Sequence, residues 1–409
     1  MPFGKFESDR GQVVNYERMR EYRTKRVVDQ MKKDGLGALV TFDQYHVRYI
    51  TGVYITHPVK WSEGQCAILL NDGNYYVDAG HIFVRSAMPD ELPWLKGRML
   101  PRLGTGKTVF TKEGLSTFTK TLAELMAKHG VSKLPVGLDG CSSEFLMGEA
   151  LKDVGIKAVD GKSTMFESTK IKNQDEIQCL RIANVIADAA FADIVDAIRP
   201  GVKECELVGV GMKRLYSEGC DETMEFVCAT GPRTNPLHID FTDRMVEPGD
   251  HVIIDINGAS WQGYKTCYYR TFTCGKATAA QKENYAVCLK MMNDAIAVIK
   301  PGVTNRDISR KFPDSPKFWG WDSWSDVGGY AVGHGVGIPL HNLPWIRQPA
   351  EAQVEFKIEE GMVFAIETWY GKKGANRDGV RLEDICVVTK DGHEVITHWP
   401  VDQLTECWR

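Results

Sequence analysis

The first third of the chain alternates between helical and strand-like patterns of hydrophobic residues. Apolar side chains between Met19 and Met31 recur at helical spacing, and the pattern stops at Asp34-Gly35. The apolar run GALVTF then has the character of a buried strand, and QCAILL and NYYVDA predict a hairpin around Asn71-Asp72-Gly73. We therefore expect a small α/β domain in this part of the chain.

The hydrophobic pattern changes near residue 168. A long amphipathic helix is predicted from 170 to 198, beginning near Asn173 and ending at Arg199-Pro200-Gly201. The elements predicted after it are helices at 203–218 and 278–299 and hairpin strands at 250–257, 268–274, 361–369 and 380–389. Two helix pairs covering a strongly bent antiparallel sheet account for this order. We thus predict an α/β domain at 1–167 and an α+β domain at 168–409.

Length and composition narrow the class of protein. A chain of 409 residues exceeds the usual size of one hydrophobic core, which supports two domains. The net charge of −4 is spread without blocks, so nothing favours nucleic acid or an anionic membrane as a partner. The polar start and the lack of a long apolar stretch predict a cytoplasmic protein. Its eleven cysteines form no CxxC pair and are expected to be reduced.

Titratable side chains interrupt apolar runs at four places: Asp255 in HVIIDING, His334 in GHGVG, Glu367 in GMVFAIETWY and Glu383 in GVRLEDICVV. Buried carboxylates need a cation, a metal or several hydrogen-bond donors. Each residue also has a structural explanation: Asp255 can start a turn, His334 can be a core histidine, and Glu383 can pair with Arg381 on one strand face. Acids on three separate strands favour a shared site, and such ligands suit Mn, Fe, Co or Zn.

Five motifs, TGPRTNPLH, GDHVIIDINGASWQGYKTCYYRTF, GHGVG, EEGMVFAIE and GVRLEDICVVT, occur in an order that resembles the creatinase/aminopeptidase P/prolidase superfamily (peptidase M24-like). The resemblance covers roughly residues 170 to 400 strongly and the N-terminal part loosely. It implies a pita-bread catalytic domain of the α+β class, preceded by a smaller creatinase-type α/β domain. It also implies a hydrolase and a homodimer.

In metal-dependent members, the resemblance implies that two aspartates, one histidine and two glutamates hold two metal ions. Asp255, His334, Glu367 and Glu383 match four of these positions, but Cys267 stands where the second aspartate is expected. Because a thiolate can bind Zn or Fe, a single-metal site that uses Cys267 remains open. The cofactor prediction is therefore none or one divalent metal, Zn, Mn or Fe.

Creatinase itself is a metal-free member in which a histidine moves the proton and carboxylates hold a cationic substrate. His238 in TGPRTNPLH matches that histidine, although a surface-loop histidine is the alternative. The predicted catalytic residues are His238, His334, Glu367 and Glu383. The predicted substrate-binding residues are Asp255, Cys267, Tyr269, His341, Arg381 and Trp369. The function predicted from these residues is a creatinase-like hydrolysis of a C–N bond in a small, cationic nitrogen compound.

Three other functions stay open. A metal-dependent Xaa-Pro peptidase would use the same residues around a metal. A lyase is suggested by similarity to dimethylsulfoniopropionate lyases of this fold, which share GPRTNP, although Asn257 stands where those proteins have a further aspartate. A non-catalytic binding protein would retain the fold and lose the chemistry.

Overall fold

The computed structural model describes residues 14–54, 65–78, 88–100, 112–141, 144–327 and 331–408. The chain divides into two compact units, Asn15–Thr169 and Lys170–Arg409. The first unit is α/β and the second is α+β, so the two-domain organisation predicted from the sequence is confirmed. No helix within the described ranges is long and apolar enough to cross a membrane.

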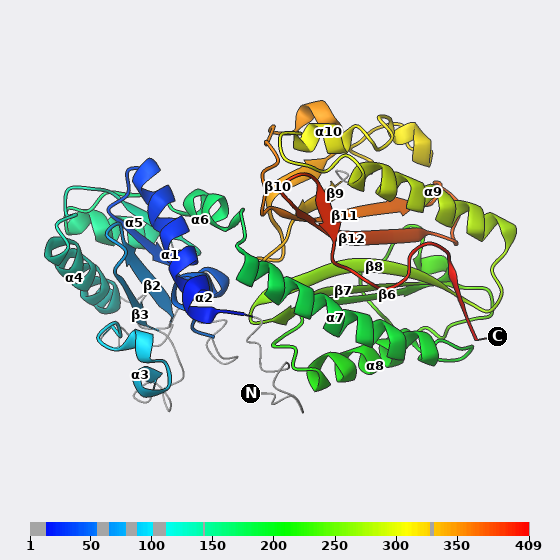
Figure 1. Cartoon of the computed structure of the whole chain (residues 1–409), viewed down its shortest axis with the longest axis horizontal. Helices are drawn as coiled ribbons and strands as arrows, with labels where there is room; N and C mark the ends of the chain where they lie inside the picture. The colour runs from blue at the N-terminus through cyan, green and yellow to red at the C-terminus, as the bar shows by residue number, and fades with distance from the viewer. Residues whose placement is uncertain are drawn as a thin grey trace. The chain divides into compact units, whose positions relative to one another are not determined.

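The N-terminal unit is a five-stranded mixed sheet with helices around it (Figure 1). Its main elements are α1 (Tyr16–Lys33), β1 (Ala38–Thr41), α2 (Gln44–Thr51), β2 (Cys66–Leu70), β3 (Tyr75–Asp78), α3 (Met88–Glu91), α4 (Lys112–Lys128), β4 (Val136–Asp139), α5 (Glu144–Asp153), β5 (Ala158–Asp160) and α6 (Lys162–Thr169). The strand order is β3-β2-β1-β4-β5, with β2 and β3 paired as the predicted hairpin. Asn15 caps α1 by accepting a hydrogen bond from the Arg18 N–H.

The C-terminal unit begins with two long helices. Its main elements are α7 (Gln174–Ala197), α8 (Glu204–Ser217), β6 (Glu225–Thr230), β7 (His251–Trp261), β8 (Tyr264–Cys274), α9 (Ala279–Ile296), α10 (Asn305–Ser309), β9 (Ala331–Gly335), β10 (Asn342–Arg347), β11 (Val363–Tyr370), β12 (Val380–Val388), β13 (His393–Val395) and β14 (Thr405–Cys407). A capping box between Asn173 and Glu176 starts α7 where the sequence pattern predicts it. In Figure 1, α7 and α8 lie along β6–β8, and α9 lies along β11 and β12.

The bent antiparallel layer expected from the sequence is divided into two sheets, with strand orders β14-β8-β7-β6 and β10-β9-β11-β12-β13. The two sheets meet where β8 lies beside β12. At this seam a side chain replaces the backbone ladder: the Thr271 hydroxyl donates to Arg381 O at 2.8 Å and accepts from Arg381 N at 2.9 Å. Side chains from the inner faces of both sheets can therefore meet beside this seam.

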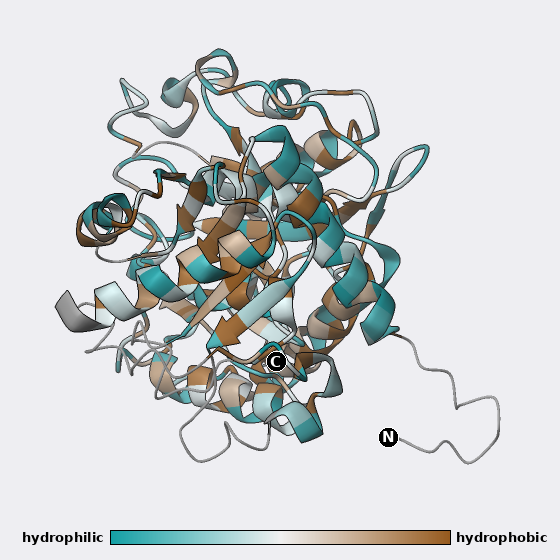
Figure 2. Cartoon of the chain, turned by 90° about the vertical axis from the view of Figure 1, so that its left-hand side faces the viewer, coloured by the Kyte–Doolittle hydropathy of each residue, from teal (hydrophilic) through white to brown (hydrophobic). Residues whose placement is uncertain are grey.

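Two apolar clusters hold this arrangement. One packs α7 and α8 against the outer face of β6–β8, through residues such as Phe191, Leu207 and Ile254. The other packs α9 and Trp319 against the outer face of β11 and β12. The hydropathy colours of Figure 2 show the strands largely brown and the helices banded in teal and brown. Because the outer faces bury the apolar residues, the inner faces can carry polar chemistry.

Candidate metal centre

Strands β7 and β8 bring three polar side chains to the inner face of their sheet. Asp255 and Asn257 are two residues apart on β7 and therefore point to the same side. In the β7–β8 register, Asp255 lies opposite Tyr269 and Asn257 lies opposite Cys267. The Cys267 thiol donates a hydrogen bond to Asn257 Oδ1 at 3.4 Å. One sheet thus supplies a carboxyl and a thiol.

The other sheet supplies an imidazole and a second carboxyl. His334 on β9 lies opposite Ala365 on β11, and Glu367, two residues further, lies opposite Glu383 on β12. His334 Nε2 lies 3.7 Å from Cys267 Sγ and 3.9 Å from Glu383 Oε1. Donor atoms of Cys267, His334 and Glu383 all lie within 4.8 Å of one another, and all three side chains are buried.

Two buried carboxyls in this space have no hydrogen-bond partner among the described residues. Both oxygens of Asp255 and both of Glu383 are in this state, although each side chain is fully buried. Burial raises the pKa of Asp255 to about 8 and, together with the charge of Glu367, raises the pKa of Glu383 well above its ordinary value. The Tyr269 hydroxyl lies near enough to lower the pKa of Asp255 without reaching hydrogen-bonding geometry. A buried acid left in this way either keeps its proton or is offset by a cation.

The donor set fits a divalent metal. His334 donates from Nδ1 to Gly335 O at 3.0 Å, which leaves Nε2 as the acceptor that faces Cys267 and Glu383. Burial lowers the pKa of His334 to about 4, so this imidazole is neutral near pH 7. Burial also raises the pKa of the Cys267 thiol, and a bound cation would offset that cost by stabilising the thiolate. One thiolate, one imidazole and one carboxylate are typical ligands of zinc.

Glu367 is held differently from the other acids. Arg381 donates a hydrogen bond to Glu367 Oε2, and its guanidinium carbon lies 4.3 Å from the centre of the Tyr269 ring. The charge of Glu367 is therefore already paired within the protein. The structure thus brings Cys267, His334 and Glu383 together, and Glu367 and Asp255 lie near enough to raise the pKa of Glu383. The roles of these residues stay a prediction.

Comparisons with known proteins agree with the two-domain fold. Residues 178–390 match the profile of Metallopeptidase family M24, and residues 23–165 match the Creatinase/Prolidase N-terminal domain. The chain belongs to metallopeptidase family M24. Its predicted membership of the superfamily and its predicted class, a hydrolase of C–N bonds, are confirmed.

Several relatives show how widely the similarity extends. The uncharacterized peptidase YqhT of Bacillus subtilis is 32% identical over 235 residues, which cover 57% of this chain and 64% of that protein. The Xaa-Pro dipeptidase of Pyrococcus horikoshii is 28% identical over 318 residues, covering 72% of this chain and 87% of that protein. The structure of the Xaa-Pro dipeptidase from Bacillus anthracis superposes with a TM-score of 0.75 at 21% identity, covering 94% of this chain and 99% of that chain.

Aromatic residues line one side of the M24 site. The His341 ring lies 4.4 Å from that of His334 and stacks on Trp345 at 5.8 Å and 18°. Although part of the His341 side chain is exposed, burial of the ring and the neighbouring His334 lower its pKa to about 4. Trp369, predicted to bind substrate, packs 5.5 Å from Trp319. The Trp345 ring also lies 5.7 Å from that of His334, so it packs beside both imidazoles.

His238 lies on the loop between β6 and β7. Its backbone N–H donates to Arg233 O at 2.9 Å and its side chain is exposed, so it is not part of the buried cluster. Its neighbour Leu237 packs against Val227 and Tyr269, which places the loop beside the site. Its predicted proton-transfer role stays a prediction.

Sequence reasoning missed the residue that holds this loop. Glu204, the first residue of α8, is fully buried. Its Oε1 accepts hydrogen bonds from the N–H and hydroxyl of Thr230, both at 2.9 Å, and its Oε2 accepts from the N–H and hydroxyl of Thr242, both at 2.7 Å. One carboxylate thus joins Thr230, where the loop begins, to Thr242 within it. The only signal in the sequence is an acid at the start of a helix, which many exposed caps share.

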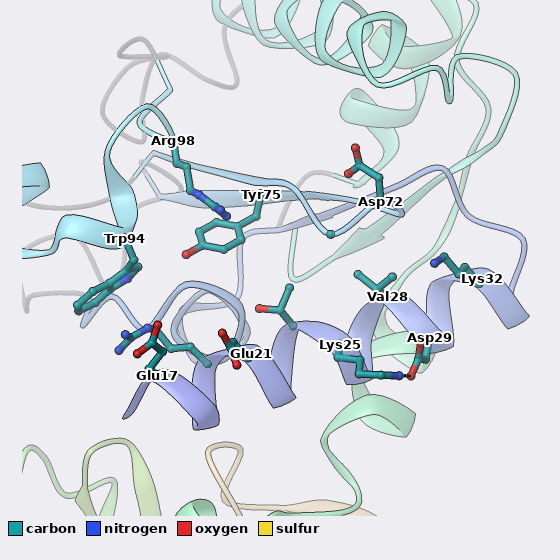
Figure 3. A pocket seen from close by; sticks show the side chains of 13 residues that line it. Glu17, Glu21, Lys25, Val28, Asp29, Lys32, Asp72, Tyr75, Trp94 and Arg98 are labelled. Atoms are coloured by element: carbon teal, nitrogen blue, oxygen red, sulfur yellow. Dashed lines mark hydrogen bonds and ion pairs between the residues drawn. The ribbon is translucent and has the colours of Figure 1, made fainter. Parts of the chain in front are cut away.

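A separate cavity of about 730 Å³ lies in the N-terminal unit of this M24 protein (Figure 3). It is lined by α1, the β2–β3 turn, Trp94 and Arg98. Figure 3 shows Lys25 paired with Asp29 along α1, and the Arg20 guanidinium lies 3.8 Å from the Trp94 ring centre. Because its charges of both signs offset one another, the cavity favours no class of ligand.

Proposed function

We propose that this M24 protein hydrolyses an amide-type C–N bond with one divalent cation held by Cys267, His334 and Glu383. One observation carries this proposal: a buried thiol, imidazole and carboxyl offer donor atoms within 4.8 Å, and neither oxygen of Glu383 has a hydrogen-bond partner among the described residues. The softness of a thiolate and the borderline character of imidazole favour a zinc-like ion over Mg or Ca.

The protein side chains have distinct parts in such a hydrolysis. A bound divalent cation would supply Lewis acidity, polarising the substrate carbonyl and lowering the pKa of water. The Nδ1 bond of His334 to Gly335 O fixes the ring so that Nε2 faces Cys267. His341, neutral near pH 7 and partly exposed, can take a proton from water and return it to the departing nitrogen.

The metal-free, creatinase-like reaction is the second candidate. The observation that favours it is Asp255, a fully buried carboxyl whose two oxygens have no hydrogen-bond partner in the described part of the chain. A cationic substrate could offset its charge without any metal. Measuring the metal content of the purified protein therefore distinguishes the two functions without any assay of products.

Metal content and spectroscopy test the proposal. The purified full chain is expected to carry about one zinc-like ion, measured by elemental analysis. After replacement with Co²⁺, a thiolate-to-cobalt charge-transfer band is expected in the near ultraviolet. Cys267→Ala should abolish the band and lower metal affinity by about 100-fold or more. Cys386→Ala, which removes a buried thiol from the opposite face of β12, should leave both unchanged.

Hydrolysis is then measured on Xaa-Pro dipeptides and on small guanidino and ureido compounds. Product formation should stop after chelation and return with metal. Full activity in protein that contains no metal would overturn the proposal and favour the creatinase-like reaction. Metal binding that survives Cys267→Ala would show that the assigned ligand set is wrong.

A further inference from the structure

The N-terminal unit carries a cluster of titratable side chains at the end of α4 that the proposed hydrolysis does not use. His129 directly follows the last residue of α4, and its Nδ1 lies 2.7 Å from Oδ2 of Asp72 in the turn between β2 and β3. Its Nε2 lies 2.8 Å from the hydroxyl oxygen of Tyr76 on β3. An acid, an imidazole and a hydroxyl are therefore joined in series.

The positions of the protons in this series follow from Asp72. Although partial burial opposes its ionisation, hydrogen bonds from the backbone N–H and the side chain of Asn74 hold the pKa of Asp72 below its ordinary value. A carboxylate can only accept, so His129 Nδ1 is the donor and Nε2 is left to accept from the Tyr76 hydroxyl. A hydroxyl held by a base that a carboxylate orients is the arrangement that activates nucleophiles.

Two fixed charges favour transfer of the proton from Tyr76 to His129. Lys128 Nζ donates to the Tyr76 hydroxyl oxygen at 3.1 Å, and a cation there stabilises the negative charge left on that oxygen. The His129 N–H donates to Leu125 O at 3.0 Å, so the imidazole stands at the C-terminal end of α4, where the helix dipole stabilises an imidazolium. Both products of the proton transfer therefore have a stabilising partner.

The Tyr76 hydroxyl lies at the surface on a ring that packing holds in place. The ring packs against the apolar cluster between α4 and the sheet, which includes Ile68 and Met126. Its centre lies 5.7 Å from that of the His129 ring, with the two rings inclined at 69°. Tyr76 is partly buried and Lys128 is exposed. A small reagent can therefore approach the hydroxyl from the side of Lys128.

We propose that Tyr76 is a nucleophile that accepts an acyl group from activated carboxylic esters. The phenol oxygen forms a bond to the ester carbonyl carbon while its proton passes to His129 Nε2. The bond between that carbon and the leaving oxygen then breaks, and His129 returns the proton to the departing group. Lys128 stabilises the negative charge that develops on the carbonyl oxygen. The product is a tyrosyl ester, and the step needs neither an oxidant nor a metal.

Covalent labelling of the purified full chain with p-nitrophenyl acetate tests this site. The attached acetyl group is measured by peptide mass spectrometry, because nitrophenol could also be released at the proposed metal site. We expect Tyr76 to be acetylated about tenfold or more faster than Tyr216 of α8, although Tyr216 is 51% exposed and Tyr76 is partly buried. Hydroxylamine should remove the label from Tyr76, since it cleaves aryl esters and leaves lysine amides intact.

Substitutions separate proton transfer from packing. Tyr76→Phe should lose the label, and His129→Gln should lower the rate at Tyr76 to about that of Tyr216. Asp72→Asn should lower the rate about tenfold or more, because the imidazole is no longer held in the required tautomer. Glu124→Gln removes one negative charge from the exposed side of α4 and should leave the rate unchanged. Circular dichroism and thermal unfolding confirm that each variant is folded.

The pH dependence of labelling distinguishes a base-assisted tyrosine from an ordinary one. With His129 as the base, the rate at Tyr76 should level off below about pH 9, whereas the rate at Tyr216 should keep rising as phenolate forms. In His129→Gln, the rate at Tyr76 should rise in the same way as that at Tyr216. Acetylation of Tyr76 no faster than that of Tyr216, unchanged rates in the His129 and Asp72 variants, or an acetyl group on Lys128 in place of Tyr76 would each overturn the proposal.

This inference is independent of the proposed hydrolysis. Tyr76 and His129 belong to the N-terminal unit, whereas the metal trio of Cys267, His334 and Glu383 belongs to the C-terminal unit. Chelation should therefore leave the labelling of Tyr76 unchanged. Protein that binds no metal but acetylates Tyr76 would refute the proposed function alone, and the reverse result would refute the Tyr76 site alone.

Discussion

Arg381 on β12 donates a hydrogen bond to Glu367 on β11, and this pair neutralises one of the carboxyls that face the metal trio. The two side chains are mostly buried, with 18% and 12% exposed. Without Arg381, the Glu367 carboxylate would lose its ion-pair partner in a space of low polarity.

We expect Arg381→Gln to lower the free energy of unfolding of the metal-free protein by about 3 kcal/mol, because a buried carboxylate loses its partner. Added metal should recover more stability in the variant than in the wild type, since the cation then offsets one more charge. Thermal unfolding with chelator and with Zn²⁺ measures both effects. Arg214→Gln, which removes exposed ion pairs to Glu218 and Asp193, should change stability by about 0.5 kcal/mol or less.

Thr271 holds the seam between the two sheets, so we expect Thr271→Val to lower the free energy of unfolding by about 2 kcal/mol. The reason is that Arg381 N and Arg381 O would both lose their hydrogen bond to the Thr271 hydroxyl. Thr273→Val is a control on the same strand, because the buried Thr273 hydroxyl has no hydrogen-bond partner among the described residues. That substitution should be neutral or stabilising. Equal losses in denaturant titrations of the two variants would contradict the role given to Thr271.

Glu204→Gln tests the attachment of the His238 loop. A glutamine has one acceptor oxygen, so its amide group would face the donors of either Thr230 or Thr242, and we expect a loss of about 2 kcal/mol. Amide hydrogen exchange of residues 231–242 should become faster. Glu206→Gln on the same helix keeps one acceptor oxygen for Lys203 N and should cost about 0.5 kcal/mol or less, with exchange of the loop unchanged.

His46 makes the stability of the N-terminal unit depend on pH, and the direction of its pKa shift sets the sign of that dependence. Burial alone would lower its pKa, but Asp139 Oδ2, 2.6 Å from Nδ1, more than offsets burial and raises the pKa above the ordinary value. The stabilisation is thus fully present below about pH 6.5 and is lost as pH rises through the folded-state pKa. The difference in unfolding free energy between wild type and His46→Gln should shrink from pH 5.5 towards pH 8.5. Parallel curves for the two proteins would count against this assignment.

Much of the fold and the members of the site could be predicted from the sequence. Asn173 marks the start of α7 by its cap pattern, and Asp255 and Glu383 stand out because a charge inside an apolar run has no local explanation. Their surroundings could not be predicted. Cys267 meets His334 across 67 residues only because two sheets join at β8 and β12, and hydrophobic periodicity says nothing about contacts between sheets.

The same limit explains the other residues that were missed. His129 has the appearance of a residue at an exposed helix end, and its contact with Tyr76 depends on the packing of α4 against the sheet. Thr271 is one threonine among several in a β-rich segment. Its role depends on a neighbour more than a hundred residues away in the chain.

The position of the metal trio at the seam has a consequence for folding. Cys267 comes from one sheet, and His334 and Glu383 come from the other, so neither sheet alone offers a complete ligand set. An ion can therefore gain its full binding free energy only after the two halves have docked. A bound ion would slow the separation of the two sheets. Resistance of the C-terminal unit to proteolysis should therefore rise with metal occupancy.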